Sequence, residues 1–546
     1  MRVVDKLYPA IHHYRMHIIV FFTQFALLYL LYGQTRGFEY VYFDDADYIL
    51  RNAFVLSGLS LENIQTAFTS FYMHNWHPLT WLSHMIDVSL FGTDPGWAHI
   101  HNVLLHGLVS LLVYTYLLRL SEDHWKSFIL SLVFLVHPLH VESVAWIAER
   151  KDLLCAVFFM LGMILYDSYR TSPSIRGYCY VLLAFGLALL SKPMAVTFPV
   201  ILLVMDVSWY QFRNNPNLPR LRSGAAAYAR LVFEKLPLFA LSAGMGIVTI
   251  IAQDRGGAVV DLEVIPFTIR LFNSVYAYTT YLKQMLMPID LSAFYPYTGI
   301  PSIPKLIFPG LLLFLWLALA VGKIRQAPLI AAGLCWYIVS LLPVIGLIQV
   351  GSQAHADRYM YLPSVGVLMS AVYLLPNKMS QHFRLGSALS FIAIIYLSFI
   401  CYWQIGYWEN RYTLFSRVLE IVGPNWRAHI ALATDYSKRG MWDKAIEHSE
   451  AARQLQPNMP ESHQSFGDIA MARGDYKKAE RIYLQAINAG HNSSGMFNNF
   501  GYALLKQGKV KPALEVFEIA LGLDPHSIQA KRNIERIHSS MSGADQ

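Results

Sequence analysis

Eleven apolar runs, each close to the length that crosses a membrane, make up nearly half of the first 407 residues of the chain. A hydrocarbon core of about 30 Å needs roughly 20 apolar residues in a helix. Of the 546 residues, 55% are hydrophobic and 14% are charged, which excludes a single soluble domain. The runs therefore predict an all-α, polytopic membrane helix bundle. They lie near residues 17–33, 98–118, 127–137, 153–167, 178–191, 194–210, 236–252, 304–322, 327–348, 360–376 and 386–407.

One further apolar segment, residues 268–287, carries Arg270, Asn273, Lys283 and Gln284. This polarity favours an amphipathic helix at the membrane surface over a twelfth span. Eleven spans with the N-terminus inside place the basic loop residues on the cytoplasmic side, in agreement with the positive-inside rule. Those residues are Arg213, Arg220, Arg222, Arg230, Lys235, Lys323, Arg325, Lys378 and Arg384. The chain after about residue 408 is accordingly predicted to lie outside.

A 34-residue repeat follows the last apolar run. Gly440, Gly474 and Gly508 stand 34 residues apart, and an alanine follows each of them after five and after twelve residues. This pattern is typical of tetratricopeptide repeats, in which two helices form one unit. We predict a membrane domain at 1–408 and a repeat α-solenoid at 409–541. The solenoid comprises a half repeat, three repeats at 426–459, 460–493 and 494–527, and a capping helix.

The predicted outward loops collect most of the unusual polar residues of the membrane domain. Ionisable groups at membrane depth cost about 2.5–3.5 kcal/mol each, so a functional site is expected where several of them converge. The residues are Asp44, Asp45, Asp47, His77, Asp87, His137, His140, Glu142, the run Glu149-Arg150-Lys151-Asp152, Lys192, Asp357 and Arg358.

This mixture of acids and cations fits transfer from a lipid-phosphate donor. Asp44 or Asp45 would take the proton of an acceptor hydroxyl. Cations would hold the departing phosphate, and the candidates for this role are Arg150, Lys151, Lys192 and Arg358. The candidate supporting residues are His77, His137, His140 and Glu142. Structural interpretations stay open: the two aspartates could cap the helix that follows, and Arg150-Lys151 could form a solvated turn between spans.

Histidine pairs at a spacing of three residues raise the possibility of a metal site. His74 and His77, or His137 and His140, could share one helical face, but Pro78 and Pro138 interrupt the two stretches and no third ligand stands at a fixed spacing. We predict no metal site from these residues, although a bound divalent ion stays open. The four cysteines lie in apolar runs, which excludes a cysteine-based zinc site. The absence of a long Lys/Arg block argues against a nucleic-acid partner.

Six motifs follow one another in the membrane domain. They are FDDADYI (43–49), HPLT (77–80), HNVLLH (101–106), VHPLHVESVA (136–145), SK (191–192) and DRYMYLPS (357–364). Together with the repeats, they resemble the transmembrane and tetratricopeptide-repeat O-mannosyltransferases and their bacterial relatives, over nearly the whole chain. The resemblance implies a GT-C glycosyltransferase fold of about eleven spans. It also implies that the aspartate pair Asp44-Asp45 is the acidic motif that contains the catalytic base.

The same resemblance implies a polyprenyl- or dolichyl-phosphate sugar as donor and a Ser/Thr hydroxyl of an exported protein as acceptor. Two features differ from the family pattern. His77 stands where eukaryotic members usually have an arginine, and the three-repeat array is short, so cadherin acceptors are not carried over. The short array and the lack of exported cysteines favour a bacterial inner-membrane protein with its active site and repeats in the periplasm.

The sequence thus predicts an inverting transferase that moves a hexose, such as mannose, from a polyprenyl-phosphate carrier to an exported protein recruited by the repeats. Inversion is expected because one base and a direct displacement need no enzyme nucleophile. The alternative is a non-enzymatic scaffold, in which the spans anchor repeats that recruit partners for envelope assembly. A carrier of lipid-linked sugars is disfavoured because the polar residues cluster on one face.

Overall fold

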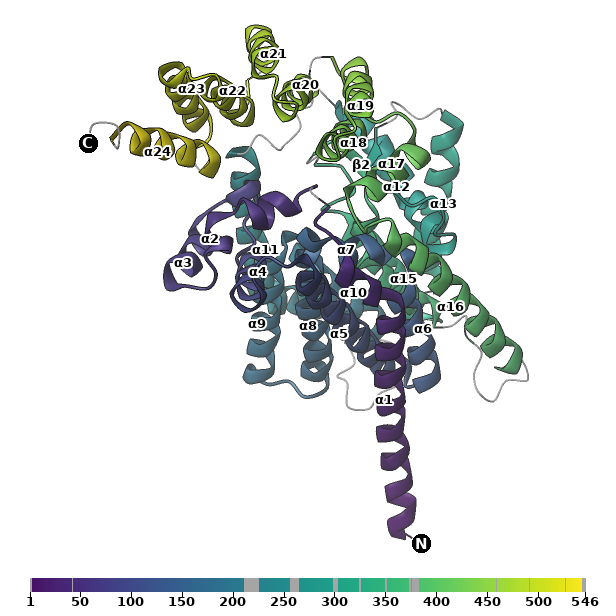
Figure 1. Cartoon of the computed structure of the whole chain (residues 1–546). Helices are drawn as coiled ribbons and strands as arrows, with labels where there is room; N and C mark the ends of the chain where they lie inside the picture. Colours follow the sequence, from purple (N-terminus) through teal and green to yellow (C-terminus); the bar gives the residue numbers. More distant parts are fainter. Residues whose placement is uncertain are drawn as a thin grey trace. The chain divides into compact units, whose positions relative to one another are not determined.

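The computed structural model divides the chain into two compact units, Met1–Glu409 and Asn410–Gln546 (Figure 1). Both units consist almost entirely of helices. The structure describes residues 2–41, 43–210, 225–255, 265–297, 303–323, 326–348, 351–372, 375, 383–457, 459–490, 492–525 and 527–542. The predicted all-α architecture is therefore confirmed.

Five described helices of the first unit are long and apolar enough to cross a membrane, and a sixth span would form if a bent pair of helices is counted as one. The five are α1 (Arg2–Tyr32, continued by η1, Gly33–Gly37), α5 (Pro95–Ser121), α8 (Arg150–Thr171), α11 (Ala225–Arg255) and α16 (Phe383–Gly406). Shorter apolar helices are α9 (Ile175–Ser191), α10 (Phe198–Met205), α13 (Ile303–Lys323) and α14 (Pro328–Leu341). These helices identify a multi-pass membrane unit, but the predicted count of about eleven spans is not confirmed.

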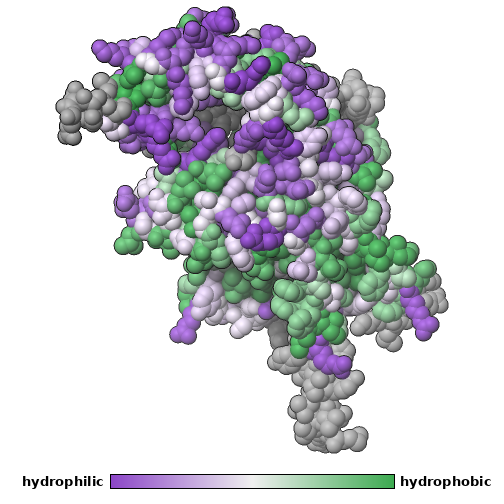
Figure 2. Space-filling model, in the orientation of Figure 1, coloured by the Kyte–Doolittle hydropathy of each residue, from purple (hydrophilic) through white to green (hydrophobic). Residues whose placement is uncertain are grey.

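The surface of this unit fits a lipid environment. α1 exposes Phe22 and Leu30, and α16 exposes Ile395 and Phe399. Figure 2 shows hydrophobic side chains gathered at the lower right of the unit, in the region where the lower part of α16 lies in Figure 1. Exposure of apolar side chains to water is unfavourable, so this surface is suited to contact with lipid.

Helix α12 (Phe267–Leu286) differs from the amphipathic surface helix that its sequence predicts. Its polar residues Arg270, Asn273 and Gln284 are buried in the protein, whereas Phe267 and Leu286 are exposed. The Asn273 side-chain amide donates to the carbonyl oxygen of Ala354 at 2.7 Å. Three of the four polar residues of α12 thus serve the protein interior, whereas Lys283 is exposed on an otherwise largely apolar outer side.

The segment between α6 (His124–Val136) and α8 is a broken stretch of short turns that are entirely buried. It contains η4 (Pro138–His140), α7 (Val141–Ala145) and η5 (Ile147–Glu149), and it bends by 52° after α6. Proline at position 138 explains the break, because it lacks the N–H that would continue the helix. The His137 ring then accepts the Leu139 backbone N–H at 3.2 Å.

The remaining elements of the first unit frame this broken segment. In chain order they are η2 (Ala46–Leu50), α2 (Ala53–Leu56), α3 (Leu61–Thr69), η3 (Tyr72–His74), α4 (Pro78–Phe91), η6 (Pro193–Thr197), η7 (Asp206–Tyr210), β1 (Tyr295–Pro296), β2 (Gln353–His355), η8 (Asp357–Met360) and α15 (Pro363–Ala371). The strands β1 and β2 pair antiparallel and place Tyr295 opposite His355. This pairing holds the start of η8, which carries Arg358, against the C-terminal end of α12.

The second unit is a series of helix pairs, as the repeat predicts. Its helices are α17 (Arg411–Val422), α18 (Trp426–Lys438), α19 (Trp442–Leu455), α20 (Pro460–Ala472), α21 (Tyr476–Asn488), α22 (Ser494–Lys506), α23 (Val510–Leu523) and α24 (Ile528–Ser542). Gly440, Gly474 and Gly508 have φ of 72°, 79° and 79° in the turns between paired helices. These left-handed values favour glycine, which explains the 34-residue spacing that marks the repeat.

Candidate active site

The two predicted catalytic aspartates have different environments. Asp45 is fully buried, and its carboxylate accepts the backbone N–H of Val41 at 3.1 Å and that of Ala148 at 3.0 Å. Both oxygens are thus occupied by backbone donors, and Asp45 ties the first loop to η5. Burial raises the pKa of Asp45 to about 7, against the opposing effect of these two hydrogen bonds.

Asp44 is only partly buried. Within the described part of the chain, its carboxylate makes no hydrogen bond or ion pair, although it lies in the field of Lys151 and Arg358. Burial raises the pKa of Asp44, while the charge of Lys151 lowers it. A partly exposed carboxylate with no committed partner, under the electrostatic influence of two cations, suits a base that faces an anionic substrate.

Glu149, at the end of η5, joins three cations from separate parts of the chain. Its carboxylate lies 3.1 Å from Lys151 Nζ, 3.1 Å from Lys192 Nζ and 3.4 Å from Arg358 Nε. All four side chains are at least about nine-tenths buried. We call Glu149, Lys151, Lys192 and Arg358 the ion cluster. It brings together three of the four cations predicted to bind phosphate.

Two more carboxylates extend the ion cluster. Lys192 Nζ lies 2.6 Å from Asp152, which also accepts the Ser143 hydroxyl at 3.2 Å. The Arg358 guanidinium lies 2.5 Å from Glu142, whose other oxygen accepts the Arg358 backbone N–H at 2.9 Å. Glu142 therefore fixes both the side chain and the backbone of Arg358, in keeping with its predicted supporting role.

Aromatic rings surround the cations on one side. Trp146 stacks between Phe43 and Trp408, with ring centroids 5.1 Å and 5.8 Å away. The Arg358 guanidinium lies 5.4 Å from the Trp146 ring, and Lys151 Nζ lies 4.7 Å from the Tyr48 ring and 3.2 Å from its hydroxyl. These faces stabilise the cations and exclude water, which strengthens every charge interaction in the site.

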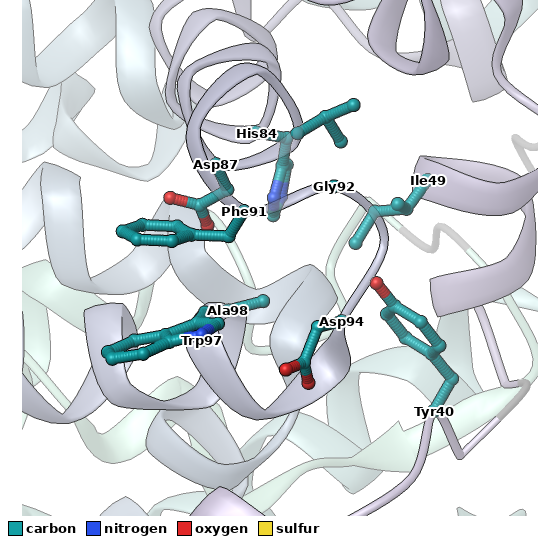
Figure 3. A pocket seen from close by; sticks show the side chains of 10 residues that line it. Tyr40, Ile49, His84, Asp87, Phe91, Gly92, Asp94, Trp97 and Ala98 are labelled. Carbon is teal, nitrogen blue, oxygen red and sulfur yellow. The ribbon is translucent and has the colours of Figure 1, made fainter.

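Arg150, the fourth predicted phosphate-binding cation, lies apart from the ion cluster. Its guanidinium pairs with Asp87 and donates to Asn102 at 2.7 Å and to the Ala98 carbonyl at 2.8 Å. Figure 3 shows Asp87 pointing into a small cavity that it lines together with His84. The cavity measures about 10 Å³, enough for roughly one water molecule.

The helical geometry at the start of α8 explains why Arg150 and Lys151 separate. Successive residues of a helix project about 100° apart, so neighbours cannot face one point. Lys151 reaches the ion cluster, whereas Arg150 turns toward α4 and α5 and is completely buried there. The alternative that Arg150 and Lys151 form a solvated turn does not hold, because both residues are buried.

The predicted supporting histidines occupy two locations. His77 is buried with no hydrogen-bond partner for its Nδ1 among the described residues, and burial and the charges of Lys151 and Lys192 lower its pKa. His137 Nε2 lies 3.0 Å from the carbonyl oxygen of Met285. His140 Nε2 lies 3.0 Å from the Ser364 hydroxyl. His77 thus faces the cations, whereas His137 and His140 fasten the broken segment to other helices.

The described residues include no group of three or more His, Cys, Asp or Glu side chains arranged to hold a metal ion. Glu149 has no predicted role of its own in the run Glu149-Arg150-Lys151-Asp152, although it is the central anion of the site. The signal that could have found it is charge balance, since three outward cations buried together need an acid between them.

No protein-family model matches the chain. The curated proteins to which it is similar include the protein O-mannosyl-transferase F38B6.6 of Caenorhabditis elegans, 23% identical over 442 residues, which cover 78% of this chain and 61% of that protein. They also include human protein O-mannosyl-transferase TMTC4, 26% identical over 434 residues, which cover 68% of this chain and 57% of that protein. The chain thus spans little more than half the length of these relatives.

Among solved structures, the chain is similar to the Archaeoglobus fulgidus oligosaccharyltransferase tethered to an acceptor peptide. The identity is 13%, the match covers 79% of this chain and 58% of that one, and the TM-score of 0.41 is too low to show a common fold. The resemblance that the six motifs predict is confirmed by the sequence relatives: over most of its length, the chain is similar to the protein O-mannosyl-transferases.

Proposed function

We propose that the chain is a membrane glycosyltransferase that moves a hexose from a polyprenyl-phosphate carrier to a Ser/Thr hydroxyl of an exported protein. One observation carries the proposal: Asp44 has an uncommitted carboxylate, and the charges of Lys151 and Arg358, two cations of the buried ion cluster, oppose the effect of burial on its pKa. The relatives, which are named protein O-mannosyl-transferases, support mannose as the sugar and protein as the acceptor.

In the proposed reaction, the acceptor oxygen attacks the anomeric carbon of the donor sugar and gives its proton to Asp44. A bond forms between that oxygen and the anomeric carbon, and the bond from the anomeric carbon to the phosphate oxygen breaks. The electron pair of the broken bond leaves with the polyprenyl phosphate. A single displacement of this kind inverts the anomeric configuration, and no residue becomes covalently attached to the sugar.

Lys151, Lys192 and Arg358 are the proposed phosphate-binding residues. Three carboxylates, Glu142, Glu149 and Asp152, hold these cations in place before a donor arrives. Cations fixed in advance stabilise developing negative charge without reorganising during the reaction. We assign Arg150 and Asp45 structural roles, because their polar atoms are occupied inside the protein.

We further propose that the site and the repeats face the periplasm of a bacterial inner membrane. The positive-inside distribution of basic loop residues in the sequence supports this orientation. α8 offers a structural counterpart: its first turn carries Lys151, one of the three cations of the site, and its last turn carries Arg170, about 30 Å away along a helix of 22 residues.

A panel of polyprenyl-phosphate sugars tests the proposal directly. Purified protein incubated with each donor and a Ser/Thr-containing peptide should release polyprenyl phosphate with at least one hexose and glycosylate the peptide. NMR of the product should show the anomeric configuration opposite to that of the donor. If no donor releases phosphate while the repeats still recruit a partner protein, the non-enzymatic scaffold replaces the transferase.

The transfer rate should depend on the protonation of Asp44. Only the carboxylate form accepts a proton, so kcat/KM should rise with pH through the Asp44 pKa. Because burial raises that pKa, the midpoint should lie above the ordinary aspartate value of 3.8. The check is a profile of kcat/KM from about pH 4 to pH 8. If kcat/KM stays constant or falls as the pH rises through this range, the base is a group other than Asp44.

A further inference from the structure

A cavity of about 380 Å³ opens between α19, α20 and α21, where the first and second repeats meet. We call it the inter-repeat cavity. Its size lies within the range of small-ligand pockets. It is lined by Glu450, Arg453, His463, Phe466, Ile482, Gln485, Ala486 and Ala489.

The next junction of the same array provides an internal comparison. Moving each lining residue 34 positions along the chain gives Leu484, Ile487, Phe497, Phe500, Val516, Ile519, Ala520 and Leu523. All eight are apolar. There Phe497 and Ala520 form a packed cluster, with Ile487 and Val516 against it. The first junction carries smaller or polar residues in place of five of these, which explains the empty space.

The replacements follow a pattern. The inner wall stays apolar through Phe466, Ile482 and Ala486, while His463 and Arg453 stand where the next junction packs Phe497 and Ile487. Ile519 and Leu523, which correspond to Gln485 and Ala489, are 48% and 51% exposed and do not fill the junction. An apolar wall without its filling residue suits an apolar side chain supplied from outside, since burial of that side chain stabilises the complex.

Positive charge flanks the cavity. Lys478 and Arg481 lie four residues before Ile482 and Gln485, so helical periodicity places them on the same face of α21. Both are exposed, and within the described part of the chain neither makes an ion pair. The corresponding positions in the third repeat are Pro512 and Glu515, so the basic flank is confined to the junction that has the cavity.

At the rim, the Arg453 guanidinium lies 2.5 Å from Glu450 and 6.0 Å from the centre of the Phe466 ring. Arg453 and Glu450 remain 46% and 37% exposed. An exposed pair of this kind contributes little to stability and opens readily to a partner. Opening of the pair leaves Arg453 available as a third cation beside the apolar wall.

We propose that the inter-repeat cavity binds a polypeptide segment that inserts one aromatic or large aliphatic side chain and carries acidic residues beside it. The proposal rests on the proposed function only for the identity of that polypeptide as the acceptor. The apolar wall selects the inserted side chain, and Lys478, Arg481 and Arg453 select the acidic neighbours.

The test uses the full-length protein in nanodiscs and three short fluorescent peptides. The first has one phenylalanine among aspartate, serine and glycine, the second has alanine in place of the phenylalanine, and the third has lysine in place of the aspartates. Fluorescence anisotropy, recorded without a sugar donor, gives each Kd. The wild-type protein should bind the first peptide about tenfold or more tightly than either of the others.

The matched variant is His463→Phe, which installs the residue that packs at the next junction, Phe497. It should fill the cavity, leave the helical circular dichroism unchanged and abolish the preference for phenylalanine. A second variant, Lys478→Glu with Arg481→Glu, should abolish the preference for the acidic peptide and leave the apolar cavity intact.

Equal binding of the phenylalanine and alanine peptides by the wild-type protein would overturn the proposal, as would unchanged binding in the filled variant. A change in particle mass on filling, measured by light scattering, would also overturn it and assign the cavity to a second copy of the chain. Peptide binding without sugar transfer from any donor would disprove the proposed transferase function alone. Sugar transfer without a preference for the phenylalanine peptide would disprove the proposed role of the inter-repeat cavity alone.

Discussion

Substitution of Asp44 by asparagine should lower kcat for sugar transfer by about 10²- to 10⁴-fold and leave the thermal unfolding of the protein unchanged. The loss follows from removal of the base, since an amide does not accept the acceptor proton. Stability should hold because the Asp44 carboxylate makes no hydrogen bond or ion pair among the described residues. Release of polyprenyl phosphate with the best donor of the panel is the measurement.

Asp45→Asn is the matched control, because it makes the same chemical change one residue away. Asparagine can accept only one of the two N–H groups of Val41 and Ala148, and its own N–H₂ would face the other. A buried donor left without an acceptor costs about 1–3 kcal/mol. Asp45→Asn should therefore lower the melting temperature, with loss of activity in proportion to unfolding. If Asp44→Asn retains turnover and folded Asp45→Asn loses it, Asp45 is the catalytic base and Asp44 has the structural role.

Replacement of Arg150 by methionine should reduce the free energy of unfolding by about 3–5 kcal/mol, the cost of leaving a buried charge without its partner. Asp87 would keep only His101, which lies 2.7 Å away and is partly exposed. Asn102 and the Ala98 carbonyl would lose their donor as well. Thermal unfolding in detergent, followed by circular dichroism, measures the effect.

The double variant Arg150→Met with Asp87→Leu separates a structural role from phosphate binding. Removing both charges leaves no unpaired ion, so the double variant should recover part of the stability that Arg150→Met loses. Donor KM should change little in the recovered protein. A raised KM with unchanged stability in Arg150→Met would instead return Arg150 to the phosphate-binding residues.

The sequence predicts the parts of this protein that depend on local patterns. Apolar runs identify the helices of a membrane unit, and the 34-residue period places glycine in the turns at Gly440, Gly474 and Gly508. Charge at unexpected places draws attention to Asp44, Lys151 and Lys192. In each case the signal lies in residue type and spacing, which the fold does not alter.

The sequence does not predict the direction in which each of these side chains points. Nothing in the run Glu149-Arg150-Lys151-Asp152 tells which side chain meets which neighbour until the helix start at residue 150 is fixed. The polar residues of α12 gave the same difficulty, because polarity shows that a face is special but not whether water or protein covers it. The distinct environments of Asp44 and Asp45 depend on Ala148, a residue about one hundred positions later.

The broken segment of residues 137–149 has a consequence for biosynthesis. Its turns satisfy only part of their own polar groups, and further partners come from both directions along the chain. Asn102 donates to the carbonyls of Val144 and Trp146, both at 3.2 Å, and is made earlier by the ribosome. Ser364, which holds His140, is made more than two hundred residues later. The site therefore cannot close as its own residues emerge, and its assembly waits until the chain has been synthesised past residue 364.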